Sequence, residues 1–409
     1  MDLEGAKRAA CAGVEAVAPL LKAASREMYE KPELGFQERT AAAILTGLLE
    51  GAGFAVERGL GGMATAFRAA LGAEGTDGPT VALLAEYDAL PGVGHGCGHN
   101  LIGAAAVGAG MALAGLGPLP GRLLVLGCPA EEGAVDGAGG KVVLVEAGVF
   151  DDVDAALMVH PAGRDAPSGG SLCRLALEIG FHGRAAHAAG APHEGINALE
   201  AVIQTFNAVN ALRQHLPGSV RVHGIVVKGG EAPNVVPDEG LIRLYVRAPS
   251  LPEAEAAAVR VTNCAKGAAL ATGCRVEFRE FAHPYVDLRP NGPLEEAFAR
   301  NMAALGRPPA AVVAEAGHGV GSTDMGNVSH VVAAIHPYIG IGTGSGGPPP
   351  HSREFAEATV SPAGQEALTV GAKALAMTCL DLFLEPELLE AVLRAGPRKG
   401  RGLGRERRC

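Results

Sequence analysis

Tryptophan is absent from this chain of 409 residues, and aromatic residues of all kinds make up only 4% of it. Charged residues are also few, at 19%, whereas hydrophobic residues reach 48%, which excludes a disordered or fibrous chain. Because large rings are scarce, alanine and the 59 glycines must account for much of the packing. The length exceeds one ordinary hydrophobic core, so we expect a soluble globular protein of two domains.

Basic stretches are equally scarce. The net charge is −10, and the one basic run lies between Arg398 and Arg408, where we expect a solvated tail. This distribution argues against a nucleic-acid partner, which would require a basic stripe. No run of about 18 apolar residues is free of charges and breakers, so no membrane span is expected.

A disulfide framework and a targeting signal are missing as well. The eight cysteines lie at unrelated spacings, and residues Met1–Gly5 lack the basic-then-apolar layout of a signal peptide. We therefore expect reduced thiols and a cytoplasmic location. In that setting a cysteine close to histidines is a candidate metal ligand or nucleophile.

Three continuous apolar runs end at polar residues. Val81–Leu84 is followed by Glu86 and Asp88, Leu123–Leu126 by Glu131 and Glu132, and Ala155–Val159 by His160. Such runs predict strands buried on both faces of a mostly parallel sheet, with helices at Ile102–Leu113 and Gly140–Ala147 covering it on both faces. Because ligands bind beyond the carboxyl ends of parallel strands, we expect the active site at these polar residues.

The middle of the chain has a different pattern. Strand and helix patterns follow in the order β-α-β-β-α-β, at Leu172–Phe181, Ile196–Leu216, Val220–Val227, Leu241–Val246, Pro252–Thr272 and Arg275–Phe281. This order predicts a ferredoxin-like domain that leaves a sheet face or an edge open to a partner. We therefore expect an α/β catalytic domain over residues 1–170 and 285–409, interrupted by an insert over residues 171–284 and ending in a helix at Gln365–Phe383.

The densest cluster of polar residues is His95–Asn100, in which glycines flank Cys97 and His99. Thiolate and imidazole aimed at one point suit zinc, and manganese fits sulfur less well. The alternative is a glycine-rich turn with incidental polar residues.

Adjacent carboxylates can divide two tasks between them. Of Glu131 and Glu132, one can bind a metal while the other accepts a proton from the attacking water. Taken alone, a glutamate pair is usually a solvated surface, and a lone histidine such as His160 or His351 is usually structural. Taken together, Cys97, His99, Glu132, His160 and His351 could bind two metals, with Glu131 as the base.

These residues carry a family resemblance. The runs Glu86–Gly92, His95–Asn100, Pro129–Glu132 and His160–Pro161 resemble the aminoacylase/carboxypeptidase family of co-catalytic metallopeptidases. Within that family the chain looks like the amidohydrolase branch with Cys-x-His, and there most like dipeptidases of basic dipeptides. The further segments with this likeness are Arg221–Ile225, Gly321–Ser329 and Ala372–Thr378. The resemblance covers nearly the whole chain.

The resemblance implies roles for single residues. It implies two divalent ions, zinc or manganese, whose ligands match Cys97, His99, Glu132, His160 and His351, with Glu131 as general base. It further implies that the insert is a lid that mediates homodimerisation, and that a lid histidine, His187 or else His223, stabilises the oxyanion. Asn234 and Arg247 resemble the pair that holds the substrate carboxylate, as an amide and a planar guanidinium can.

The implied function is metal-dependent hydrolysis of the amide bond in small-molecule dipeptides with a free C-terminal carboxylate, ending in lysine, ornithine or arginine. The alternatives are an amidohydrolase of N-acyl amino acids or of aminobenzoyl-glutamate, and a catalytically silent, dimeric metal-binding protein. One departure is that the wider family has His-x-Asp where this chain has Glu86, Tyr87 and Asp88. We therefore expect Cys97 and His99 to supply the missing metal contacts.

Overall fold

The computed structural model describes residues 2–72, 75, 78–309, 321–342 and 347–397. The chain divides into two compact units. Ser171–Asp287 and residues 321–323 form the second unit, and the other described residues form the first. The main segment of the second unit is Ser171–Asp287, whereas the sequence analysis placed the insert at residues 171–284.

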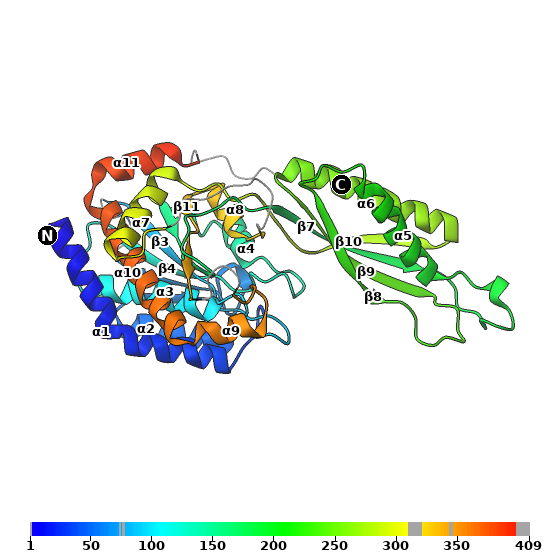
Figure 1. Ribbon diagram of the computed structural model, residues 1–409, viewed down its shortest axis with the longest axis horizontal. Helices are drawn as coiled ribbons and strands as arrows, with labels where there is room; N and C mark the ends of the chain where they lie inside the picture. Colours follow the sequence, from blue (N-terminus) through cyan, green and yellow to red (C-terminus); the bar gives the residue numbers. More distant parts are fainter. Residues whose placement is uncertain (1, 73–74, 76–77, 310–320, 343–346, 398–409) are drawn as a thin grey trace. The chain divides into compact units, whose positions relative to one another are not determined.

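The first unit contains a six-stranded sheet (Figure 1). Its strands are β1 (Ala55–Arg58), β2 (Phe67–Leu71), β3 (Thr80–Ala85), β4 (Arg122–Gly127), β5 (Ala155–Leu157) and β11 (Ala333–Ile335), in the spatial order β1-β2-β4-β3-β5-β11. The four neighbouring strands β4, β3, β5 and β11 are parallel to one another. Strand β2 pairs in the antiparallel direction with both β4 and β1. The sequence patterns did not predict β1 or β2. Strand β1 is the edge strand, and its residues are mostly exposed.

Helices cover this sheet. They are α1 (Leu3–Glu30), α2 (Arg39–Gly51), α3 (His99–Ala114), α4 (Gly140–Glu146), α7 (Gly292–Ala304), α8 (Met325–Ser329), α9 (Arg353–Thr359), α10 (Pro362–Leu384) and α11 (Pro386–Ala395). Successive strand residues point to opposite faces, so Leu83 packs into one core with α1, α3 and α10, and Leu84 packs into a second core with α4 and α8. Both faces are therefore buried, which is why these strands are continuous apolar runs.

One helix of the first unit is unusually apolar. Among the described residues, α10 alone reaches the length and hydropathy of a membrane-spanning helix, with a mean hydropathy of 1.6. However, 83% of its most apolar window is buried inside the protein. Its side chains pack into the core with α1 and α3, so α10 is a core helix of the first unit.

The second unit has the expected β-α-β-β-α-β order. Its elements are β7 (Cys173–His182), α5 (Ala198–Arg213), β8 (Arg221–Lys228), β9 (Glu239–Ala248), α6 (Leu251–Thr272) and β10 (Arg275–Tyr285). The antiparallel sheet has the order β10-β7-β9-β8, and α5 and α6 pack together with its apolar residues in one core. A short 3-10 turn, Pro192–Glu194, precedes α5, whose first N–H groups are capped by Asn197.

The central strands should dominate the stability of the first unit. Leu83 is fully buried in β3, so Leu83→Ala should lower the free energy of unfolding by about 2–5 kcal/mol through lost burial and a cavity. The matched control is Leu20→Ala on α1, where the side chain is 53% exposed and the change should stay within about 0.5 kcal/mol. Urea unfolding followed by circular dichroism measures both, and equal losses would contradict this description of the core.

Candidate metal centre

The loop between β3 and α3 turns sharply at a glycine. Gly98 has a φ of +81°, which favours glycine, and a Cβ there would lie 2.8 Å from the Pro161 ring. The helix α3 begins directly at the next residue, His99, which is fully buried. The glycine therefore lets Cys97 and His99 approach the strand end that carries His160.

Asp88 orients two of the expected ligands. Its Oδ1 lies 2.8 Å from Nδ1 of His99, and its Oδ2 accepts the backbone N–H of Glu132 at 2.9 Å. A carboxylate only accepts, so Nδ1 of His99 carries the hydrogen and Nε2 is left for another partner. That Nε2 lies 3.9 Å from Oε2 of Glu131 and 3.9 Å from Oε1 of Glu132.

His160 is oriented in the same way. It begins the short strand β6 (His160–Ala162), which pairs in parallel with β12 (Tyr338–Gly340). Its Nδ1 lies 2.8 Å from the carbonyl oxygen of Pro161, and its Nε2 lies 3.5 Å from Sγ of Cys97. An Nδ1–H anchored to a carbonyl, with Nε2 directed toward other ligand atoms, is the usual arrangement of metal-binding histidines.

His351 reaches the cluster from a distant part of the sequence. Its backbone N–H donates to the carbonyl of Gly96 at 2.8 Å, and a Cβ on Gly96 would lie only 3.3 Å from the Cα of His351. Nε2 of His351 lies 3.8 Å from Oε1 of Glu132. The side chain is 57% exposed, unlike the other expected ligands, and its φ of +67° is left-handed.

All five expected ligands and the expected base therefore lie in one cluster of the first unit. Cys97, His99 and His160 offer ligand atoms within 4.8 Å of one another, and so do Cys97, Glu132 and His351. Nε2 of His99 and Oε1 of Glu132 are buried and have no hydrogen-bond partner among the described residues. Sulfur, imidazole and carboxylate donors around such atoms fit divalent ions, zinc in particular.

Burial controls the protonation of these groups. It raises the pKa of Glu132 to about 7, raises that of Glu131 well above its usual range, and lowers the pKa of His160 to about 3. Burial also raises the pKa of the Cys97 thiol. A cation that binds here would therefore displace protons from the thiol and the carboxylates.

Glu86 also lies at the centre, as its position after the first apolar run predicted, although it was not among the expected ligands. Its Oε2 lies 3.3 Å from Nε2 of His99, so the residue that replaces the family histidine still faces the centre and adds a carboxylate to it. Its other oxygen lies 2.5 Å from Nζ of Lys141, which also lies 2.5 Å from Oδ1 of Asp324. Lys141 and Asp324 were not expected in the site, because neither follows one of the three apolar runs.

Two further buried residues adjoin the cluster. The ring of His336 lies 5.1 Å from that of His160, and its two buried ring nitrogens have no hydrogen-bond partner among the described residues. Glu38 accepts the backbone N–H of Ala130 at 2.9 Å and the hydroxyl of Thr65 at 2.8 Å. Ala130 has a left-handed φ of +54°, so Glu38 holds a strained turn directly before the two glutamates.

The remaining expected residues lie in the second unit. Nδ1 of His187 accepts the N–H of Gly190 at 3.0 Å, which leaves the hydrogen of a neutral ring on Nε2 as a donor. The backbone of Ala188 donates to Asn234, so His187 and Asn234 lie on paired segments. Both residues are exposed.

Arg247 lies beside the alternative histidine. Its Nε lies 3.2 Å from Nε2 of His223, and its Nη1 donates to the hydroxyl of Ser322 at 2.9 Å. The guanidinium also lies 5.5 Å from the ring centre of Tyr245. Burial, followed by Arg247, lowers the pKa of His223. Ser322 thus contacts Arg247, the expected carboxylate-binding residue, and the sequence analysis did not single out Ser322.

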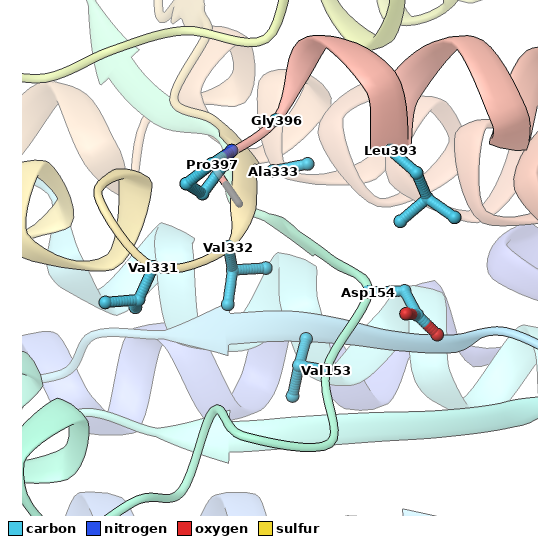
Figure 2. A pocket seen from close by; sticks show the side chains of 8 residues that line it. All are labelled: Val153, Asp154, Val331, Val332, Ala333, Leu393, Gly396 and Pro397. Carbon is cyan, nitrogen blue, oxygen red and sulfur yellow. The ribbon is translucent and has the colours of Figure 1, made fainter. Parts of the chain in front are cut away.

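A pocket of about 300 Å³ lies elsewhere in the first unit (Figure 2). Its lining includes Val153 and Asp154, which precede β5, and Val331 and Val332, which precede β11. These are the amino ends of parallel strands, whereas the candidate ligands follow carboxyl ends. The pocket is therefore at the opposite end of the sheet from the metal centre.

Comparisons with known proteins assign the chain to a family. It is 41% identical over 404 residues to the Xaa-Arg dipeptidase of Mus musculus, covering 96% of this chain and 92% of the mouse protein. The chain belongs to the M20 peptidase family. Residues 174–270 match the peptidase dimerisation domain of that family, within the second unit.

Two further comparisons extend the likeness. The chain is 38% identical over 310 residues to one of the subunits of the p-aminobenzoyl-glutamate hydrolase of Escherichia coli, covering 69% of this chain and 62% of that protein. Its fold matches the crystal structure of a dinuclear metal-binding M20 peptidase from Bacillus subtilis, with a TM-score of 0.64 and 24% identity over 90% of this chain and 99% of that one. The M20 fold of a catalytic α/β unit with an inserted dimerisation domain confirms the fold class expected from the sequence.

The buried Glu38 should make stability depend on pH. Burial, then the nearby Asp88 carboxylate, raises the pKa of Glu38 from 4.5 to about 7. Because the pKa of Glu38 is higher in the folded than in the unfolded chain, the contribution of Glu38 to the free energy of unfolding is complete below pH 4.5. This contribution is lost as the pH rises through about 7. Relative to Glu38→Gln, the wild-type free energy of unfolding should therefore fall by about 3 kcal/mol across this window. Urea unfolding at several pH values measures the difference, and a constant difference would contradict it.

Proposed function

We propose that this M20 peptidase hydrolyses the amide bond of dipeptides that end in a free carboxylate, with lysine, ornithine or arginine in the C-terminal position. The observation that carries the proposal is the cluster of Cys97, His99, Glu132, His160 and His351 beside the buried carboxyl group of Glu131. The likeness to Xaa-Arg dipeptidase over 96% of the chain supports the basic C-terminal residue.

The five ligands would hold two divalent ions, and the thiol favours zinc over manganese. Bound there, the ions supply Lewis-acid activation of the scissile carbonyl and of the attacking water. Glu131 accepts the proton of that water and returns it to the leaving amine, as a general base and then a general acid. The raised pKa of Glu131 reflects burial, which keeps competing solvent away from its carboxyl group.

Residues of the second unit would bind the rest of the substrate. His187 donates from Nε2 to the developing oxyanion, a role supported by the N–H groups that occupy its Nδ1. Asn234 and Arg247 hold the C-terminal carboxylate, and Ser322 helps to fix the guanidinium. Fixing a terminal carboxylate favours dipeptides over internal peptide bonds.

The second unit also supports a homodimer. Its edge strand β8 exposes Ile225, Val226 and Val227 by 64%, 48% and 47%. An exposed apolar edge strand offers unpaired backbone groups to a second strand. Two copies that pair through β8 would cover these side chains, in keeping with the match to a dimerisation domain. We also propose a cytoplasmic location, which suits a protein whose seven described cysteines form no disulfide bond with one another.

The first experiment is release of lysine from β-alanyl-lysine by the purified protein with added zinc or manganese. We expect turnover that a chelator abolishes and that either metal restores, because the ligands and the carboxylate-binding residues act together. The C-terminal amide of the same dipeptide is the matched control and should not be cleaved. Turnover of only N-acetyl amino acids or only aminobenzoyl-glutamate would show that the substrate is that compound class and not a dipeptide. Aminobenzoyl-glutamate is the second candidate, which the likeness to the Escherichia coli hydrolase supports.

Glu131→Gln tests the proposed base. The amide keeps the shape of the side chain but cannot accept the proton, so kcat should fall roughly 100- to 10,000-fold while KM and metal content change little. Metal analysis and a melting curve on the same preparation serve as controls for loading and folding. Wild-type turnover by a folded, metal-loaded variant would remove Glu131 from the mechanism.

A further inference from the structure

The side chain of Lys141 has an unusual place for a lysine. It is fully buried on α4, directly beside the metal centre, and its ammonium lies between Glu86 and Asp324 at 2.5 Å from an oxygen of each. The backbone N–H of Lys141 donates to the second oxygen of Asp324 at 2.9 Å. Such a charge is retained in a protein interior only when neighbouring charges compensate for its desolvation.

The carboxylates around this ammonium resemble a cation site. Oxygens of Glu86, Glu131 and Asp324 lie within 4.8 Å of one another, and all three residues are buried. Clusters of carboxylate oxygens are the ligands that hard divalent cations such as Mn²⁺ prefer. The second oxygen of Glu86 is buried without a hydrogen-bond partner among the described residues and lies 3.3 Å from Nε2 of His99. One cation position therefore directly adjoins the proposed centre.

We propose that Lys141 is a built-in counter-ion that occupies this third cation position. Its ammonium offsets one of the two negative charges of Glu86 and Asp324, excludes a third divalent ion, and holds Glu86 with its other oxygen toward His99. Lys141 is thus a positioning residue of the centre, and the inference rests on the proposed metal-dependent function. A purely structural ion pair would stabilise the fold without controlling how many ions the protein binds.

Lys141→Ala tests this role, because it removes the ammonium and leaves space between the carboxylates. Metal analysis after dialysis against Mn²⁺ should give one more ion per chain than the wild type, and Mn²⁺ should raise the melting temperature of the variant more than that of the wild type. Lys141→Met is the matched control: its uncharged side chain fills the same space, so it should gain no ion. Adding Asp324→Asn to Lys141→Ala removes a carboxylate and should abolish the gain.

The outcomes separate this inference from the proposed function. The ions bound by the wild type report on the proposed centre, whereas the difference between Lys141→Ala and the wild type reports on Lys141. An unchanged or lower ion count in Lys141→Ala overturns the inference, as does an equal gain in Lys141→Met. If Lys141→Ala is recovered only in the presence of Mn²⁺, the inference is supported. If it stays insoluble with Mn²⁺ while the neutral variant Glu86→Gln, Lys141→Met, Asp324→Asn folds, the inference is wrong.

Discussion

The carboxylate of Asp88 joins the two central parts of the candidate metal centre. One oxygen fixes the ring of His99, and the other holds the backbone of Glu132, so the segments after β3 and β4 share a single anchor. With Nδ1 committed to Asp88, the free Nε2 of His99 faces Glu86, Glu131 and Glu132. Ligand orientation is thus set by a residue that is not itself one of the expected ligands, as is common around metals.

This arrangement brings several negatively charged side chains close together inside the protein, which is electrostatically unfavourable. Glu86, Glu131, Glu132, Asp88 and Asp324 are all buried, and like charges at short range in a protein interior repel strongly. The pKa of Glu86 is nevertheless lowered to about 2, because Lys141 and His99 outweigh the effect of burial, whereas the pKa of Glu131 is raised. The site therefore combines a carboxylate whose pKa Lys141 lowers with carboxylates whose pKa burial raises, and a cation bound there would displace protons from the latter.

The sequence predicted the parts of the site that follow from strand ends. His160 directly follows an apolar run, and Glu131 and Glu132 come a few residues after another. Parallel strands bring their carboxyl ends together, so the proximity of these residues could be expected. The place of Lys141 and Asp324 in the site could not be predicted. Their contact joins residues that are 183 apart in the sequence, and a lysine on a short helix is usually solvated. The order of the insert was predictable from its alternating patterns, whereas the edge strand β1 has only four residues, is mostly exposed and gave no such pattern.

The segment that carries His351 is far from Cys97 and His99 in the sequence, and a glycine at position 96 allows its backbone to approach theirs. The backbones of Gly96 and His351 are hydrogen-bonded, and any side chain at position 96 would contact Val93 at 2.7 Å. At Gly140, a Cβ would lie 1.9 Å from the carbonyl oxygen of Pro129, so the helix that carries Lys141 also needs a glycine to approach the turn before Glu131. The glycine-rich, aromatic-poor composition is therefore a condition for bringing backbone segments, and through them charged side chains, into one small buried volume.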